Sequence, residues 1–133
     1  MAAKRERILT GTIWEERNGY ARAVKVGPHI YVSGTLAADE GGNILHPGAP
    51  HLQTLAALEK IETALQGFGA SRTDVVRTRI YVTSIRSEQE VGRAHLEFFG
   101  DLMPCCTMVE VSHLASPLAE VEVEVDAVVA AEV

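Results

Sequence analysis

Apolar side chains recur every three or four positions in two segments of the chain. In the first segment, between residues 51 and 68, the apolar positions are Leu52, Leu55, Leu58, Ile61, Leu65 and Phe68. This spacing places one apolar stripe along a helix, and the glycines at 67 and 69 end it. Residues 87–100 repeat the spacing, so the sequence predicts two amphipathic helices.

β-branched and aromatic residues dominate the segments around these helices. Short runs of this kind, separated by the turn pairs Asn18-Gly19 and Gly27-Pro28, occupy residues 13–14, 20–26 and 29–32. Further strands are predicted at 75–85, 104–114 and 121–129, and a Gly- and Pro-rich loop at 39–50. The predicted order is ββ(β)αβαββ, an α+β domain in which two helices cover only one face of a mixed sheet.

The last predicted strand alternates strictly between apolar and acidic residues. The valines at 121, 123 and 125 point one way, and the acidic residues Glu120, Glu122, Glu124 and Asp126 point the other. Arg77 and Arg79 have the same spacing, so we hypothesise that they face the carboxylates, within a subunit or across an interface. A solvated acidic face is the alternative, and the sequence leaves both open. The sheet face without helices needs another cover, which favours an oligomer.

Composition narrows the class of protein. The 133 residues are 47% apolar and 23% charged, which predicts one globular domain, 1–133. The net charge of −6 repels polyanions, so nucleic acid is an unfavourable partner. The only cysteines, Cys105 and Cys106, are too few for a disulfide scaffold and favour a cytoplasmic protein. No apolar run long enough for a signal peptide or membrane span is found, so we expect neither export nor insertion.

Several segments, taken in order, resemble the RidA/YjgF family. They are GYARAV at 19–24, VSGT at 32–35, DVVRTRIYV at 74–82, HLEFF at 95–99, PCCTMVEV at 104–111 and VEVEVDA at 121–127. The order of these segments along the chain makes the resemblance specific, because each motif alone is weak evidence for the family. The resemblance implies a chorismate-mutase-like subunit with a six-stranded mixed sheet. It also implies a homotrimer with the sheets forming an inner barrel, the helices outside, and small-metabolite clefts at the subunit interfaces.

The resemblance also implies a chemistry. Family members with deaminase activity hydrolyse enamines or imines to 2-keto acids and ammonia without a metal or cofactor, and an arginine binds the substrate carboxylate. Cys106 occupies the position of that arginine here. A thiol lacks the planar fork of N–H donors that a guanidinium offers to a carboxylate. If nothing compensates, the loss of about 3 kcal/mol weakens binding of the same acid by around two orders of magnitude. The sequence therefore favours an imine, enamine or related substrate other than the standard 2-imino acid, or a non-catalytic metabolite-binding or regulatory protein.

Other site residues follow from the resemblance. Tyr20 matches a tyrosine near the ligand, Gly34 a glycine of close approach, and Glu124 the glutamate that positions the hydrolytic water, while Thr107 adjoins Cys106 in the ligand-binding segment. Considered alone, Glu124 is one charge on a solvated strand face, Tyr20 a packing residue and Gly34 a turn or bulge. Glu124 is our candidate for the chemistry, because a carboxylate among other acids can exchange protons.

Three further residues allow more than one interpretation. Arg22 follows Tyr20 by two positions, on the same side of a predicted strand, and we hypothesise that it partly replaces the missing arginine. A solvent-facing or salt-bridged arginine is the alternative. Cys106 could be a nucleophile, but spacing places no histidine beside it, so we interpret it as a buried or half-buried, inert cysteine. Lys60 is interpreted as an ordinary surface lysine. No metal-ligand spacing occurs, and the ribonuclease role often attached to relatives ranks last, given the charge.

Overall fold

Residues 4–130, which the computed structural model describes, form six strands and three α-helices. In chain order these are β1 (Arg5–Ile8), α1 (Ile13–Asn18), β2 (Ala23–Val26), β3 (His29–Leu36), α2 (Pro50–Gln66), β4 (Val75–Val82), α3 (Glu88–Phe99), β5 (Cys105–Glu110) and β6 (Val121–Val128). Three short 3₁₀-helices lie between them: η1 (Arg72–Asp74), η2 (Ile85–Ser87) and η3 (Gly100–Leu102). None of the helices in this part of the chain is long and apolar enough to cross a membrane.

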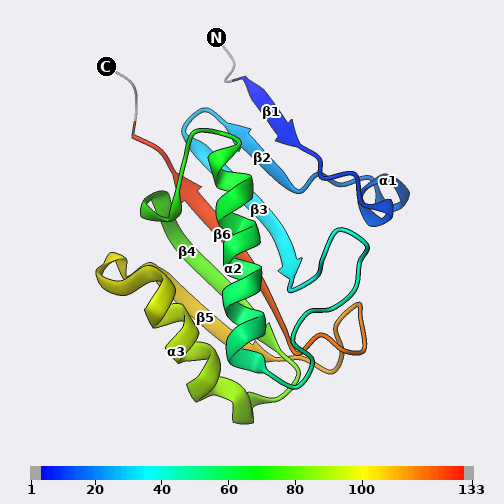
Figure 1. The fold of residues 1–133 in the computed structure, drawn as a ribbon. Coiled ribbons are helices and arrows are strands. Elements are labelled where there is room, and N and C mark those ends of the chain that lie inside the picture. The colour runs from blue at the N-terminus through cyan, green and yellow to red at the C-terminus, as the bar shows by residue number, and fades with distance from the viewer. Residues whose placement is uncertain (1–3, 131–133) are drawn as a thin grey trace.

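The six strands form one mixed sheet in the order β1-β2-β3-β6-β4-β5. Neighbouring strands are antiparallel except for β4 and β5, which are parallel and are joined through α3. The two long helices, α2 and α3, lie side by side against one face of the sheet (Figure 1). The α+β class, the six-stranded mixed sheet and the placement of these two helices are confirmed.

The first segment differs from the prediction. Ile13 and Trp14 begin the short helix α1 rather than a strand, because Thr12 caps the backbone N–H of Glu15 and Gly19 closes the helix in the left-handed conformation, at φ 72°. The strand predicted at 20–26 begins only at Ala23, so Tyr20 and Arg22 precede β2. The strand predicted at 104–114 ends at Glu110, which leaves His113 in a loop.

The core lies between α2, α3 and the helix-bearing face of the sheet. The alternation predicted for β6 is confirmed: Val121, Val123 and Val125 are at most 1% exposed, and they lie in one cluster with Leu58 and Leu65 of α2. Burying each of these side chains stabilises the fold by about 1.5–3 kcal/mol relative to an exposed position. The acidic residues of β6 consequently point to the opposite, open face.

Gln53 fastens the start of β6 to α2. Its side chain is completely buried. Its Oε1 accepts a hydrogen bond from the Glu120 N–H at 2.9 Å, and its Nε2 donates to the carbonyls of Leu118 and His46 at 3.1 and 3.3 Å. One amide therefore satisfies three backbone groups on two loops, and it sets where β6 enters the sheet.

We predict that Gln53→Ala lowers the free energy of unfolding by about 2–4 kcal/mol, because it leaves buried backbone groups unpaired and a cavity behind. Urea denaturation at fixed protein concentration measures the change. Gln66→Ala, at an exposed position near the end of the same helix, is the matched control and should change stability by less than about 0.5 kcal/mol. Equal effects of the two substitutions would contradict the role of Gln53.

Candidate functional site

The arginines of β4 face the carboxylates of β6 within one chain. The register pairs Arg77 with Asp126 and Arg79 with Glu124. Asp126 Oδ2 lies 3.3 Å from Arg79 Nη1 and 3.9 Å from Arg77 Nε. The hypothesis that these arginines oppose the acidic row is confirmed, and β4 therefore neutralises one end of the row.

Glu124, the next carboxylate along β6, is held by Tyr81. The Tyr81 hydroxyl donates a short hydrogen bond to Glu124 Oε1. This bond is the main cause that raises the pKa of Tyr81, and burial and the Glu124 charge act in the same direction. Tyr81 thus remains a neutral donor, and it fixes the direction in which Glu124 can present its second oxygen.

Glu122 lies against the backbone of β3. A methyl group at Gly34 would lie only 2.9 Å from Glu122 Cδ, so the carboxyl occupies the space that the glycine leaves free. The register between β3 and β6 shifts between Val32 and Thr35, which places Gly34 at an irregularity of the strand. Burial, followed by the charge of Glu124, raises the pKa of Glu122, and the charge of Arg22 opposes this.

Arg22 links Gly34 of β3 to Glu15 of the helix α1. Its Nη1 donates to the Gly34 carbonyl at 2.8 Å and to Thr35 Oγ1 at 3.2 Å, and its Nε lies 3.7 Å from Glu15 Oε2. Its guanidinium carbon is 5.8 Å from the centre of the Tyr20 ring. Tyr20, Arg22 and Gly34 are therefore brought together, although Tyr20 and Arg22 do not share a strand.

Sequence reasoning missed Glu15, whose carboxylate lies beside the guanidinium of Arg22. Its side chain is buried and accepts hydrogen bonds from the N–H of Thr10, at 2.8 Å, and from the Thr10 hydroxyl. Burial alone would raise the pKa of Glu15, but the bonds from Thr10 and the charge of Arg22 outweigh it and lower the pKa. The spacing of Thr12 and Glu15 is that of a helix-capping box, a signal that could have identified α1 and its buried acid.

Cys106 and Thr107 lie away from this group. Both are on the edge strand β5, and β4 and β6 separate it from β3 by about 14 Å at ordinary strand spacing. Cys106 is exposed, so the prediction that it is buried or half-buried was wrong: it lies on an edge strand. It pairs with Thr78, which faces the helices, whereas Thr107 pairs with Arg79 on the open face. Thr78 shares a 2.9 Å hydrogen bond with His95 Nε2, and burial lowers the pKa of His95. One chain therefore does not bring Cys106 to Tyr20, Arg22, Gly34 and Glu124.

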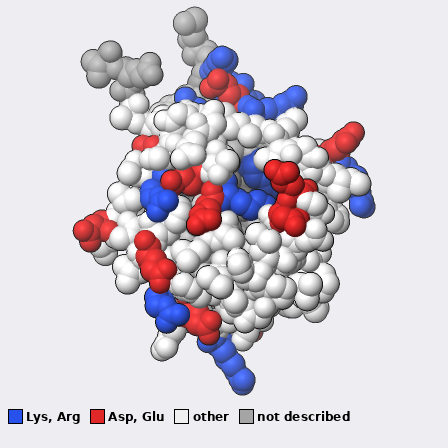
Figure 2. Space-filling model, viewed as in Figure 1, with Lys and Arg blue, Asp and Glu red and all other residues white. Residues whose placement is uncertain are grey.

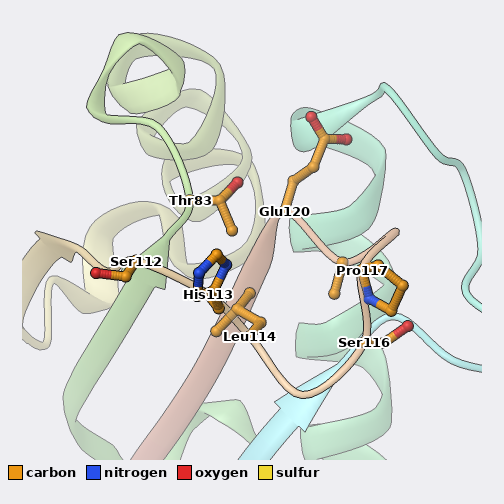
Figure 3. Close-up of a pocket in the computed structure, with 8 residues that line it drawn as sticks. Thr83, Ser112, His113, Leu114, Ser116, Pro117 and Glu120 are labelled. Atoms are coloured by element: carbon orange, nitrogen blue, oxygen red, sulfur yellow. The ribbon is translucent and has the colours of Figure 1, made fainter.

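Glu120, at the start of the acidic row, takes part in a different feature. It precedes β6 and borders a hollow of about 210 Å³ (Figure 3). The other residues that line the hollow come from the segment after β4 and the loop before β6: Thr83, Ser112, His113, Leu114, Ser116, Pro117 and Ala119. Glu120 Oε2 is buried without a hydrogen-bond partner among residues 4–130. The continuous carboxylate row thus comprises Glu122, Glu124 and Asp126.

Known proteins resemble this chain in sequence and in fold. The sequence profile of the family described as Endoribonuclease L-PSP matches residues 12–129. The RutC family protein PYRAB12510 of Pyrococcus abyssi is 31% identical over 109 residues, which are 82% of this chain and 84% of that protein. The chain belongs to the RidA/YjgF family.

Other members of the RidA/YjgF family extend the likeness. The uncharacterized protein SCO2049 of Streptomyces coelicolor is 36% identical over 121 residues, or 91% of this chain and 90% of that protein. The crystal structure of Rv2704 from Mycobacterium tuberculosis, a member of the YjgF/YER057c/UK114 family, superposes with a TM-score of 0.86 at 42% identity. The superposition covers 95% of this chain and 100% of the Rv2704 chain. The subunit thus has the RidA/YjgF fold over nearly its whole length.

The described polar groups of this RidA/YjgF chain offer carboxyls rather than a cluster of metal ligands. Within residues 4–130, no group of three His, Cys, Asp or Glu side chains has an arrangement suited to a metal ion. On the open face, Glu122 and Glu124 are instead adjacent carboxyls on one side of a strand, between the cations of Arg22 and Arg79. Such a pair can orient a water molecule and exchange a proton with a bound nitrogen.

We predict that Glu122→Gln makes the subunit more stable near pH 7 but not near pH 4. The pKa of Glu122 in the folded state is raised above the usual 4.5. The stability that the protonated carboxyl contributes is therefore complete below pH 4.5, and it is lost as the pH rises through the folded-state pKa. Thermal unfolding from pH 4 to 8 measures the effect. Glu59→Gln, at an exposed position of α2, should give no pH-dependent gain. A gain for Glu122→Gln that is equal at both ends of the range would refute this assignment.

Proposed function

We propose that this protein binds small metabolites in clefts between subunits and hydrolyses an imine, an enamine or a related reactive intermediate. The observation that supports the proposal is the carboxyl pair Glu122 and Glu124. One member is oriented by the Tyr81 hydroxyl, and the other has a raised pKa. The raised pKa of Glu122 suits it to the role of acid, and the hydrogen bond from Tyr81 orients Glu124 for a role as base.

In the proposed reaction, Glu124 orients the hydrolytic water. The oxygen of Glu124 that is not bonded to Tyr81 accepts a proton of the water as it attacks the carbon of the C=N bond. Glu122, as the acid, gives a proton to the nitrogen, and a carbinolamine forms. The proton that Glu124 took from water then passes to the nitrogen while Glu122 takes the proton of the carbinolamine hydroxyl, so that the C–N bond breaks as the C=O bond forms and ammonia or an amine leaves. Gly34 lets the carboxyl of Glu122 approach the backbone closely, and Arg22 holds the Gly34 carbonyl in place. Neither step requires a metal or a cofactor.

Because the predicted site residues form two separate groups in one chain, we favour a cleft that forms between two subunits. Tyr20, Arg22 and Gly34 lie together, and Cys106 and Thr107 lie on the edge strand β5. A homotrimer in which β5 of one copy approaches the open face of the next would join the two groups. The exposed apolar side chains of that face, Tyr31 at 49% and Val109 at 42%, would then be covered. A cytoplasmic location accords with the free thiols.

The proposed substrate lacks a carboxylate at the usual position. Cys106 cannot form the forked pair that an arginine makes. Arg22 already uses Nη1 for Gly34 and Thr35 and lies beside Glu15, so at most one edge of its guanidinium remains for a ligand. Arg22 is therefore a partial replacement, with its main role in positioning. The acidic row also repels an anionic substrate and favours a neutral or protonated imine.

Decay of two freshly generated imines tests the proposal. One is 2-iminobutyrate, released by an amino-acid dehydratase, and the other is a carboxylate-free imine released by an amine oxidase. We expect this protein to accelerate the second, and Glu124→Gln to reduce that acceleration by about 10²–10⁴-fold. Glu59→Gln is the control. If the folded oligomer, its mass established by light scattering, accelerates neither imine, then catalysis is rejected and a non-catalytic metabolite-binding role remains.

Restoring the arginine provides a gain-of-function test. We predict that Cys106→Arg accelerates the decay of 2-iminobutyrate by about 10²-fold over the wild type, which corresponds to roughly 3 kcal/mol of carboxylate binding. Cys105→Arg, whose side chain points to the opposite side of β5, is the matched control and should give no such gain. No difference between the two variants would show that Cys106 does not line the cleft.

A further inference from the structure

The hollow of about 210 Å³ that Glu120 borders lies just beyond the end of the carboxylate row (Figure 3). Val82 and Val121 are the last pair in the register of β4 with β6, and the next N–H, that of Thr83, donates to the Glu120 carbonyl at 3.1 Å. Thr83 and Glu120 are therefore opposed residues, whose side chains share one face of the sheet. The loop that follows β5 supplies the other polar lining residues, Ser112, His113 and Ser116.

The carboxylate of Glu120 is uncompensated among residues 4–130. On the helix-bearing side, acidic and basic side chains lie close together in a band (Figure 2), as in the ion pair of Arg72 with Glu62. On the open face, Arg79 pairs with Asp126. Glu120 takes part in no such ion pair, and its Oε2 is buried without a hydrogen-bond partner. A carboxylate that has lost water without gaining a donor attracts a cation.

The backbone fixes where this carboxylate lies. The Glu120 N–H donates to Oε1 of the completely buried Gln53 at 2.9 Å, and the Glu120 carbonyl accepts from Thr83. Both backbone groups are thus held before any ligand arrives. Oε2 is closed off from solvent, but Glu120 as a whole is only half-buried, so a ligand reaches the carboxylate through its other oxygen.

The lining of the hollow offers hydrogen-bond acceptors. The hydroxyls of Thr83, Ser112 and Ser116 can each accept a bond, as can one nitrogen of a neutral His113 ring, and a carboxylate only accepts. No Lys, Arg, Trp, Tyr or Phe is among the described lining residues. The hollow therefore suits a positive charge that carries N–H groups. A quaternary ammonium, which lacks N–H donors, is instead held by aromatic rings.

We propose that this hollow binds small primary ammonium ions. The three N–H groups of such an ion bond to Glu120 and to the hydroxyls around it, and a short alkyl chain packs against Leu114 and Pro117. The described residues contain no group of three His, Cys, Asp or Glu suited to a metal ion, which favours an organic cation here. The site is separate from the pair Glu122 and Glu124, and it does not require that the protein hydrolyse imines.

Titration of the isotopically labelled wild-type oligomer with methylammonium chloride, followed by NMR of the backbone amides, tests the proposal. We expect saturating shifts at Thr83, Ser112 and His113, with a Kd of about 1–100 mM at constant ionic strength. Tetramethylammonium chloride has the same charge but no N–H group, and it should bind at least about tenfold more weakly. No saturating shift at these amides, or equal binding of the two ions, would overturn the proposal.

Two substitutions of similar shape locate the site. Glu120→Gln removes the charge and should weaken methylammonium binding at least about tenfold, whereas Glu59→Gln, at an exposed position of α2, should leave it unchanged. Thr83→Val removes one hydroxyl and should weaken the binding of methylammonium but not of tetramethylammonium. The amide spectrum of each variant verifies that it folds. Unchanged binding in Glu120→Gln, or shifts that gather at Glu122 and Glu124 instead, would show that the hollow is not the site.

Discussion

The period-two alternation of β6 is the constraint on which the rest of the molecule depends. This strand lies between β3 and β4 in the sheet. Its valines are buried against α2 and α3, so its carboxylates must all lie on the open face. A shift of one residue in register would place the acids in the core and the valines in water. The same alternation that builds the core therefore also concentrates Glu122, Glu124 and Asp126 beside the groups that orient them.

Arg22 links β3 to the helix α1. It is held between the carbonyl of Gly34 and the buried carboxylate of Glu15, and its charge opposes the rise in the pKa of Glu122. A buried guanidinium with several committed partners is stiff, and losing one partner leaves an uncompensated charge. The function of Arg22 is thus better described as fixing the surroundings of other groups than as binding a ligand by itself.

Regular periodicity made much of the fold predictable. The apolar stripe of α2 and the alternation of β6 follow from side-chain spacing, whereas the spacing of Arg77 and Arg79 left open whether they face the carboxylates, as the ion pair of Arg79 with Asp126 shows they do. Helix α1 was missed because the apolar Ile13 and Trp14 resemble a strand, while the capping by Thr12 and Gly19 decides the local structure. The contact of Gly34 with Glu122 depends on an irregularity in the register of β3, which no periodic pattern contains. Similarly, the hydrogen bond from Lys60 to the Ala38 carbonyl depends on where the loop after β3 passes, so the helix pattern shows only a polar position.

The strand order also has a consequence for how the chain folds during synthesis. The last strand to be made, β6, is inserted between β3 and β4, so both of these strands have an open edge until the C-terminal part of the chain is available. Pairs such as Tyr31 with Asp126 join residues far apart in sequence, and closing such long loops slows folding. A nascent chain that pauses before Val121 therefore exposes two unpaired β-edges, the state in which aggregation and chaperone binding occur.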